Sequence, residues 1–188
     1  EFTGTGSTPC CGMLIDDIKI YECPTDEEKP EILNPPENLE VECIKDVPPA
    51  PSLLLSDNCD PLPTISFKET SQQIDPCTRK ITRHWDVEDA CDNKNQADQI
   101  IDVIDRQPPV FSRLPVDLTV SCDKDPAKAF ADWIKKRGDA QATDACGPVS
   151  WRVNYERDPR NTCDSLIVEF IAIDHCGNED IAYASFFV

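Results

Sequence analysis

The stretch Trp85-Asp-Val-Glu-Asp-Ala-Cys91 ends a run of alternating apolar and polar residues that begins at Lys80. Such alternation over several residues is typical of a β-strand with one buried face. The turn after this strand, Asp89-Ala-Cys91, occurs again as Asp174-His-Cys176. A strand followed by the same short turn at two places predicts an all-β chain built from a repeated unit.

Four cysteines occur in the same order in each copy of the repeat. The matched pairs are Cys43 and Cys122, Cys59 and Cys146, Cys77 and Cys163, and Cys91 and Cys176. We predict two tandem domains from this match, at 35–106 and 107–188. Residues 1–34 are expected to hold the end of an upstream unit followed by an acidic, proline-rich linker. Domains this small bury little core by themselves, so stabilising disulfides are expected.

Short β-branched and aromatic runs, separated by Pro, Asp and Asn turns, predict a small sandwich in each copy. The second copy also has an insert that predicts one short helix. Asp125 can cap this helix, Pro126 fits its first turn and Gly138 can end it. Phe130 and Trp133 share one helical face with Ile134, which predicts a core contact. The expected strands are 39–43, 64–70, 80–87, 99–104, 118–122, 150–155, 166–172 and 183–188.

Composition narrows the class of protein. The 188 residues include 36 acidic and 18 basic side chains, and the net charge is −18. This charge repels nucleic acid and anionic membranes, so neither is an expected partner. The 11 cysteines form no Cys-x-x-Cys pair of the kind that zinc modules use. They are therefore interpreted as disulfides of a secreted or surface-displayed protein.

The order of the strands predicts the disulfides within each copy. Successive strands reverse direction, so successive cysteines lie at alternate ends of the sandwich. A strand rises ~3.3 Å per residue and bridged Cα atoms lie within ~7 Å, so cysteines at opposite ends cannot meet. Three further cysteines, Cys10, Cys11 and Cys23, have no assigned pairing, and at least one lacks an internal partner. The predicted bonds are Cys43–Cys77, Cys59–Cys91, Cys122–Cys163 and Cys146–Cys176.

The segment from Trp85 to Asn93, with the strand and Pro-Pro junction that follow it, resembles the hyalin-repeat (HYR) group of immunoglobulin-like modules. Relatives of this group occur in large bacterial surface proteins. Phe170 and Asp174-His-Cys176-Gly-Asn178 follow the same pattern, whereas the first copy departs from it at Asp92. The resemblance covers about 35–188. It implies immunoglobulin-like sandwiches with adhesive, matrix or spacer roles, and it implies no catalytic residues.

Two other classes of function compete with the adhesive one. For catalysis, neither His84 nor His175 lies near a nucleophile motif, so the chain is not expected to be an enzyme. The alternative function is a carbohydrate-binding module, or an accessory domain of a larger secreted enzyme. That function needs exposed aromatic side chains, whereas Trp85, Trp133 and Trp151 occupy periodic positions and are expected to be buried.

Acidic residues gather around the turns and the junction between the copies, and calcium is the natural extracellular counter-ion for them. The predicted ligands are Asp102, Asp105, Asp144, Asp174 and Asn178. The other reading of this acidity is that it only keeps the protein soluble. The expected partners are neighbouring repeats and a surface protein or glycan that the sequence does not identify.

Overall fold

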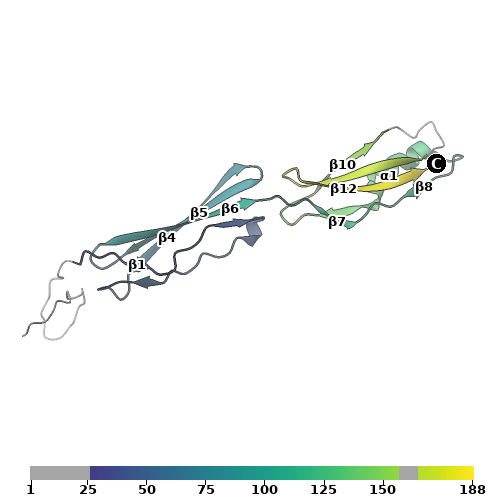
Figure 1. Ribbon diagram of the computed structural model, residues 1–188. Coiled ribbons are helices and arrows are strands. Elements are labelled where there is room, and N and C mark those ends of the chain that lie inside the picture. Colours follow the sequence, from purple (N-terminus) through teal and green to yellow (C-terminus); the bar gives the residue numbers. More distant parts are fainter. Residues whose placement is uncertain (1–25, 157–164) are drawn as a thin grey trace, which may run out of the picture. The chain divides into compact units, whose positions relative to one another are not determined.

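The computed structural model describes residues 26–156 and 165–188 (Figure 1). Within these ranges the chain forms twelve β-strands and one α-helix, so the predicted all-β class is confirmed. The chain divides into two compact units. Unit 1 comprises the described residues up to Glu40, Val47–Gln73 and Arg79–Asp102; unit 2 comprises Val41–Asp46, Ile74–Thr78 and Val103–Val188. The domain boundaries 35–106 and 107–188 stay a prediction.

Unit 1 is built on a four-stranded sheet and a two-stranded sheet. The larger sheet has the order β2-β6-β5-β4 and the smaller sheet pairs β1 with β3 in antiparallel fashion. A short 3-10 turn, Ile44–Asp46, follows β2 and belongs to unit 2. The strands are β1 Glu31–Ile32, β2 Leu39–Val41, β3 Leu55–Ser56, β4 Thr64–Asp75, β5 Thr78–Glu88 and β6 Lys94–Ile104.

Strand β5 carries the core of unit 1 on one face. Its burial alternates along the strand, as the sequence predicts, and Trp85 and Val87 pack with Leu53. Arg83 lies on the same buried face, where Glu69 Oε2 accepts from its Nε at 2.7 Å and Gln99 Oε1 accepts from Nη1 at 3.2 Å. Because these acceptors satisfy the guanidinium, its charge can remain in a buried position.

The last residues of the predicted linker belong to the fold of unit 1. Residues Glu31–Ile32 form β1, and the backbone N–H of Leu33 donates to Leu54 O at 2.9 Å. The Asn34 side chain also donates to Ser52 O at 3.0 Å. These hydrogen bonds contradict the interpretation of 31–34 as linker. The proposed upstream strand and most of the rest of the linker, residues 1–25, lie outside the described residues.

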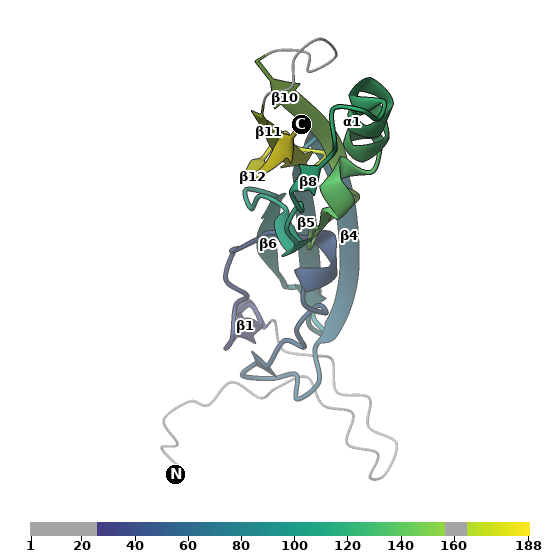
Figure 2. The same ribbon diagram turned by 90° about the vertical axis from the view of Figure 1, so that its right-hand side faces the viewer.

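Unit 2 repeats this plan of a four-stranded and a two-stranded sheet. Its larger sheet has the order β10-β11-β12-β8, in which β8 runs parallel to β12, and its smaller sheet pairs β7 with β9. Figure 2 shows helix α1 beside β10 in this unit. The elements are β7 Val110–Arg113, β8 Leu118–Thr119, α1 Pro126–Lys135, β9 Gln141–Thr143, β10 Ser150–Tyr155, β11 Leu166–Ile173 and β12 Glu179–Phe187.

The predicted helix is present and its predicted face is in the core. The side chain of Asp125 caps α1 by accepting from Lys128 N at 3.0 Å. Trp133 is buried, and its ring lies 5.2 Å from the ring of Phe170. The helix ends at Lys135, and a 3-10 turn then contains Gly138 with φ of 59°. That left-handed conformation suits glycine.

Candidate functional site

Two aspartates shape the turns that carry cysteines in unit 2. Oδ1 of Asp144 accepts from the backbone N–H of Cys146 at 2.7 Å, and Oδ1 of Asp174 accepts from that of Cys176 at 2.7 Å. A side-chain oxygen that accepts from the backbone two residues later forms an Asx turn. The repeated Asp-x-Cys pattern therefore has a structural reason, because the carboxylate fixes the backbone on which the cysteine stands.

Two disulfides in unit 2 join the first sequence copy to the second. Cys43 bonds to Cys146 with a Cα–Cα distance of 5.0 Å, and Cys77 bonds to Cys176 with a Cα–Cα distance of 5.2 Å. The predicted bonds Cys43–Cys77 and Cys146–Cys176 are therefore wrong. Strand counting places Cys43 and Cys77 at one end of the first copy, but each of them bonds to a cysteine of the second copy instead of to the other.

The other predicted bonds have different outcomes. No disulfide joins Cys59 to Cys91, which contradicts that predicted pair. Cys122 is disulfide-bonded, but its predicted partner Cys163 lies outside the described residues. Cys10, Cys11 and Cys23 lie outside them as well.

The segment after β6 places Asp105 against the Asp-x-Cys turns of unit 2. The Asp105 N–H is 3.4 Å from Cys77 O, and Asn178 Nδ2 donates to Asp105 O at 3.3 Å. A carboxylate oxygen of Asp105 and one of Asp144 lie within 4.8 Å of each other. Asn178 also donates from Nδ2 to Asp174 Oδ2 at 2.8 Å, so it ties the turn to the segment.

Asp105 is a buried carboxylate with one oxygen left unsatisfied. The residue is 6% exposed, and its Oδ2 has no hydrogen-bond partner among the described residues. Burial, followed by the negative charge of Asp144, raises the pKa of Asp105 above its ordinary value. The charge of Asp174 acts in the same direction. A nearby cation would relieve both the burial cost and the repulsion.

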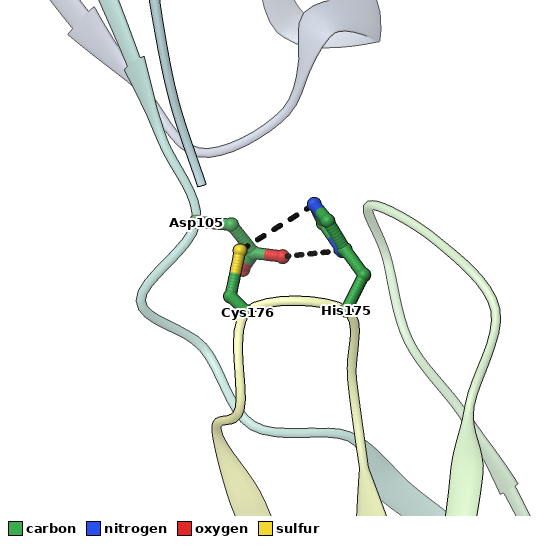
Figure 3. Close-up of side chains that lie close together, drawn as sticks. All are labelled: Asp105, His175 and Cys176. Atoms are coloured by element: carbon green, nitrogen blue, oxygen red, sulfur yellow. Dashed lines mark hydrogen bonds and ion pairs between the residues drawn. The ribbon is translucent and has the colours of Figure 1, made fainter. Parts of the chain in front are cut away.

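Figure 3 shows Asp105 beside His175 and Cys176. His175 Nδ1 lies 3.7 Å from Asp105 Oδ2, and its Nε2 lies 3.4 Å from Cys176 Sγ. The Cys176 sulfur is already in a disulfide, so it offers no thiolate to a metal. The same holds for Cys146. The donors that remain beside Asp105 are mainly oxygens, which suit a hard cation better than zinc.

The five predicted ligands are not all in this place. Asp105, Asp144, Asp174 and Asn178 belong to the arrangement just described. Asp102 belongs to unit 1, is half-buried in β6, and lies with its Oδ1 3.7 Å from Lys80 Nζ. Asp102 is in none of the acidic clusters that the described residues form.

Unit 1 contains a second acidic cluster with the same construction. Carboxylate oxygens of Asp26, Asp57 and Asp89 all lie within 4.8 Å of one another. The Oδ2 atoms of Asp26 and Asp57 are buried without a hydrogen-bond partner among the described residues. Asn93 Nδ2 donates to Asp26 O at 2.9 Å and to Asp89 Oδ2 at 2.8 Å, as Asn178 does in unit 2.

Sequence reasoning missed Asp26 as a site residue, although the sequence contains a signal for it. Asp26 precedes Pro30 by four residues, as Asp105 precedes Pro109. Both prolines are fully buried. This spacing extends the repeat to residues that the composition alone indicates as linker.

The histidine in β5 has an ordinary electrostatic role. His84 Nδ1 lies 2.6 Å from Asp98 Oδ1, and its Nε2 lies 3.0 Å from Asp86 Oδ1. The hydrogen bond to Asp98, and next that to Asp86, raises the pKa of His84. The two carboxylates stabilise the imidazolium form of His84 on the surface of the sheet.

The tryptophans do not form an exposed platform. Trp85 and Trp133 are buried, as predicted. Trp151 is half-buried, with the Arg137 guanidinium 5.1 Å from its ring centroid. None of the helices in the described ranges has the length and apolar character needed to span a bilayer.

Several solved structures resemble this chain at low sequence identity. The chain is similar to domains EC1-4 of Drosophila N-cadherin, with 11% identity and a TM-score of 0.34, over 85% of this chain and 49% of that one. It thus spans about half of the N-cadherin chain. For EC1-2 of human mucin-like protocadherin the identity is 10% and the TM-score 0.31. The similarity covers 85% of this chain and 97% of that one. For the Ig1-2 module of the Drosophila receptor tyrosine phosphatase DLAR the identity is 12% and the TM-score 0.27. The similarity covers 86% of this chain and 99% of that one.

Comparison with curated proteins finds no match. A family model described as a HYR-like domain with four cysteines matches residues 31–103. This range contains Cys43, Cys59, Cys77 and Cys91, the four cysteines of the first copy. The resemblance predicted from the segment after Trp85 is thereby confirmed for residues 31–103, which match this model.

Proposed function

We propose that this chain is an adhesive or spacer segment of a secreted or cell-surface protein, and that calcium bound at its acidic clusters stiffens it. The observation that supports calcium most strongly is the buried Asp105 carboxylate, whose unsatisfied Oδ2 lies in a cluster with Asp144. Burying a carboxylate oxygen without a hydrogen-bond partner is costly, so such an oxygen is expected where a cation binds. The recurrence of the arrangement at Asp26 and Asp57 supports the same conclusion.

In unit 2 the residues have separate tasks. Asp105 and Asp144 have carboxylate oxygens available to a cation, whereas both oxygens of Asp174 already accept hydrogen bonds from Cys176 or Asn178. Asp174 would then contribute charge and hold the turn, and Asn178 would fix the backbone of Asp105. Calcium accepts water for the rest of its oxygen shell, so two or three protein carboxylates suffice for a weak extracellular site.

Calcium at Asp105 would act on the segment between two sequence copies. This segment follows β6 and precedes β7, and it carries exposed Arg106 and Gln107 before buried Pro109. An ion shared by Asp105 and Asp144 would hold the segment against the turn that carries Cys146. The proposed role is therefore mechanical: the repeated units give the protein its length, and the bound ions make it stiffer.

Titration calorimetry of the full chain with calcium chloride tests the proposal. We expect two sites with dissociation constants of about 0.1–1 mM, the range of extracellular calcium modules. The melting temperature should rise in millimolar calcium, because a ligand that binds only the folded state stabilises it. Magnesium should bind more weakly, since it demands a more regular shell and loses water reluctantly.

Three variants separate a specific site from general acidity. Asp105→Asn and Asp26→Asn should each remove one of the two sites and leave the other. Asp102→Asn is the matched control, because Asp102 is an acidic residue of the same region that pairs with Lys80 outside both clusters. Absence of heat and an unchanged melting temperature in millimolar calcium would contradict the proposal, and so would equal effects of all three variants.

A further inference from the structure

The acidic cluster of unit 2 has one nitrogen donor beside its oxygens. His175 Nδ1 lies 3.7 Å from Asp105 Oδ2, and Figure 3 shows the two side chains turned toward each other. The Asp105 side chain is 4% exposed and its Oδ2 has no hydrogen-bond partner among the described residues, whereas the His175 side chain is 41% exposed. The buried oxygen therefore faces a nitrogen that an ion from solvent can reach.

The gap between these two atoms fits a metal ion better than a hydrogen bond. Hydrogen bonds between nitrogen and oxygen are normally about 2.7–3.2 Å long, so the separation of 3.7 Å is too long for one. Two ligands that each lie about 2.1 Å from a tetrahedral ion are about 3.4 Å apart. The observed separation is thus close to that of two ligands of one ion.

The glycine of the Asp144 turn makes room for the histidine ring. A Cβ on Gly147 would lie 3.2 Å from His175 Nδ1, which is closer than ordinary van der Waals contact. Gly147 N itself donates to Asp144 Oδ1 at 3.1 Å, so the ring lies against this turn. The other ring nitrogen, Nε2, lies 3.4 Å from Cys176 Sγ. A proton on Nε2 would make that contact a hydrogen bond and leave the Nδ1 lone pair for an ion.

The acidic cluster of unit 1 lacks both the histidine and the glycine. Its turns place Ala90 and Asp60 where unit 2 has His175 and Gly147. The backbones match, because Asp60 N donates to the aspartate that begins its turn at 2.7 Å, as Gly147 N does in unit 2. The donors grouped in unit 1 are carboxylate oxygens. The two clusters therefore share their acidic turns and differ in the nitrogen.

We propose that the unit 2 cluster also binds a divalent transition-metal cation of the class of zinc, whereas the unit 1 cluster takes only hard cations such as calcium. The ligands are His175 Nδ1 and carboxylate oxygens of Asp105 and Asp144, with water in the fourth position. Imidazole nitrogen favours zinc and its neighbours, whereas carboxylates and water suit calcium. The inference rests on the cluster of the proposed function and deepens it, because zinc and calcium would compete for Asp105.

The other histidine of the chain is an internal control. The sequence contains two histidines, and in His84 both ring nitrogens already face carboxylates. Nδ1 lies 2.6 Å from Asp98 Oδ1 and Nε2 lies 3.0 Å from Asp86 Oδ1. These are hydrogen-bond distances, so both nitrogens are engaged with protons and offer no lone pair to an ion.

Titration of the full chain with zinc chloride, followed by the imidazole NMR resonances and by calorimetry, tests the inference. We expect the ring resonances of His175 to shift until one equivalent is bound, and those of His84 to stay unchanged. His175→Ala should weaken zinc binding about tenfold or more, since losing even an outer-shell partner of a ligand costs that much. The same variant should bind calcium as the parent does, and His84→Ala should bind zinc as the parent does. Zinc that shifts only the His84 ring, or that binds His175→Ala as tightly as the parent, would overturn the inference.

A double variant transfers the two residues to unit 1. Asp60→Gly combined with Ala90→His should create a second zinc site, and the introduced imidazole should respond to zinc together with that of His175. Binding of a single equivalent in this variant would contradict the proposed difference between the clusters. Calcium binding without a zinc response of His175 overturns this inference alone, whereas a zinc response without calcium binding overturns the proposed function alone.

Discussion

Replacing Cys43 and Cys146 together with alanine is expected to lower the free energy of unfolding of unit 2 by about 4 kcal/mol. The bond closes a loop with a sequence separation of 103 residues, and loops of that length lose the most chain entropy when they are cross-linked. Urea unfolding followed by tryptophan fluorescence measures the change, since Trp133 and Trp151 both lie in unit 2.

The matched control is the double variant of Cys43 and Cys77. In this variant Cys146 and Cys176 lose their partners and two new thiols become available, whereas the Cys43 and Cys146 variant creates none. Thiol quantification under denaturing conditions distinguishes the two. A rise of two thiols in the Cys43 and Cys146 variant would contradict the observed pairing.

Replacing Phe170 with alanine should destabilise unit 2 by about 4 kcal/mol, since truncation of a buried aromatic ring leaves a cavity. Phe170 is fully buried in β11, and its ring meets the ring of Trp133 edge-on at 5.2 Å. A Cβ placed on Gly138 would lie 3.4 Å from the Phe170 ring, so the ring is enclosed on that side too. The measurement is again urea unfolding.

Phe187→Ala is the matched control for that variant. Phe187 is the same residue type at the end of β12, but it is 40% exposed and leaves the core intact when truncated. We expect a loss below about 1 kcal/mol, as for most surface substitutions. Equal losses in the two variants would contradict the described core of unit 2.

Local patterns were sufficient to predict much of the fold. Strand β10 has the predicted bounds, residues 150–155, because its alternation is regular and its ends are marked by turns. Helix α1 begins where Asp125 and Pro126 predict it. The short strands β1 and β7 were missed, since runs of two to four residues carry too little periodicity to be recognised.

Local sequence patterns did not predict the disulfide partners. Strand counting grouped Cys43 with Cys77, and both bond to cysteines of the second copy. It could not choose between a partner in the same copy and a partner in the next one, because that choice depends on how far each turn projects from the sheet. In the structure Cys43 bonds to Cys146, which stands on a turn that the Asp144 carboxylate fixes.

The acidic site of unit 2 could be predicted only in part from local patterns. Asp105, Asp144, Asp174 and Asn178 follow from the repeated turns and the junction. Asp102 was included because it is close in sequence, but Lys80 pairs with it and it is in neither acidic cluster. Asp26 could be predicted only if residues before the first predicted strand were assigned to the repeat.

Disulfides join the two successive copies, and one cleavage experiment tests this directly. A recognition site for a specific protease is inserted between Arg106 and Gln107, which are both exposed, and the oxidised chain is cut there with its thiols blocked. On a denaturing gel without reductant the two fragments should stay together, held by Cys43–Cys146 and Cys77–Cys176, and should separate only when reductant is added. Separation into two fragments without reductant would contradict the account.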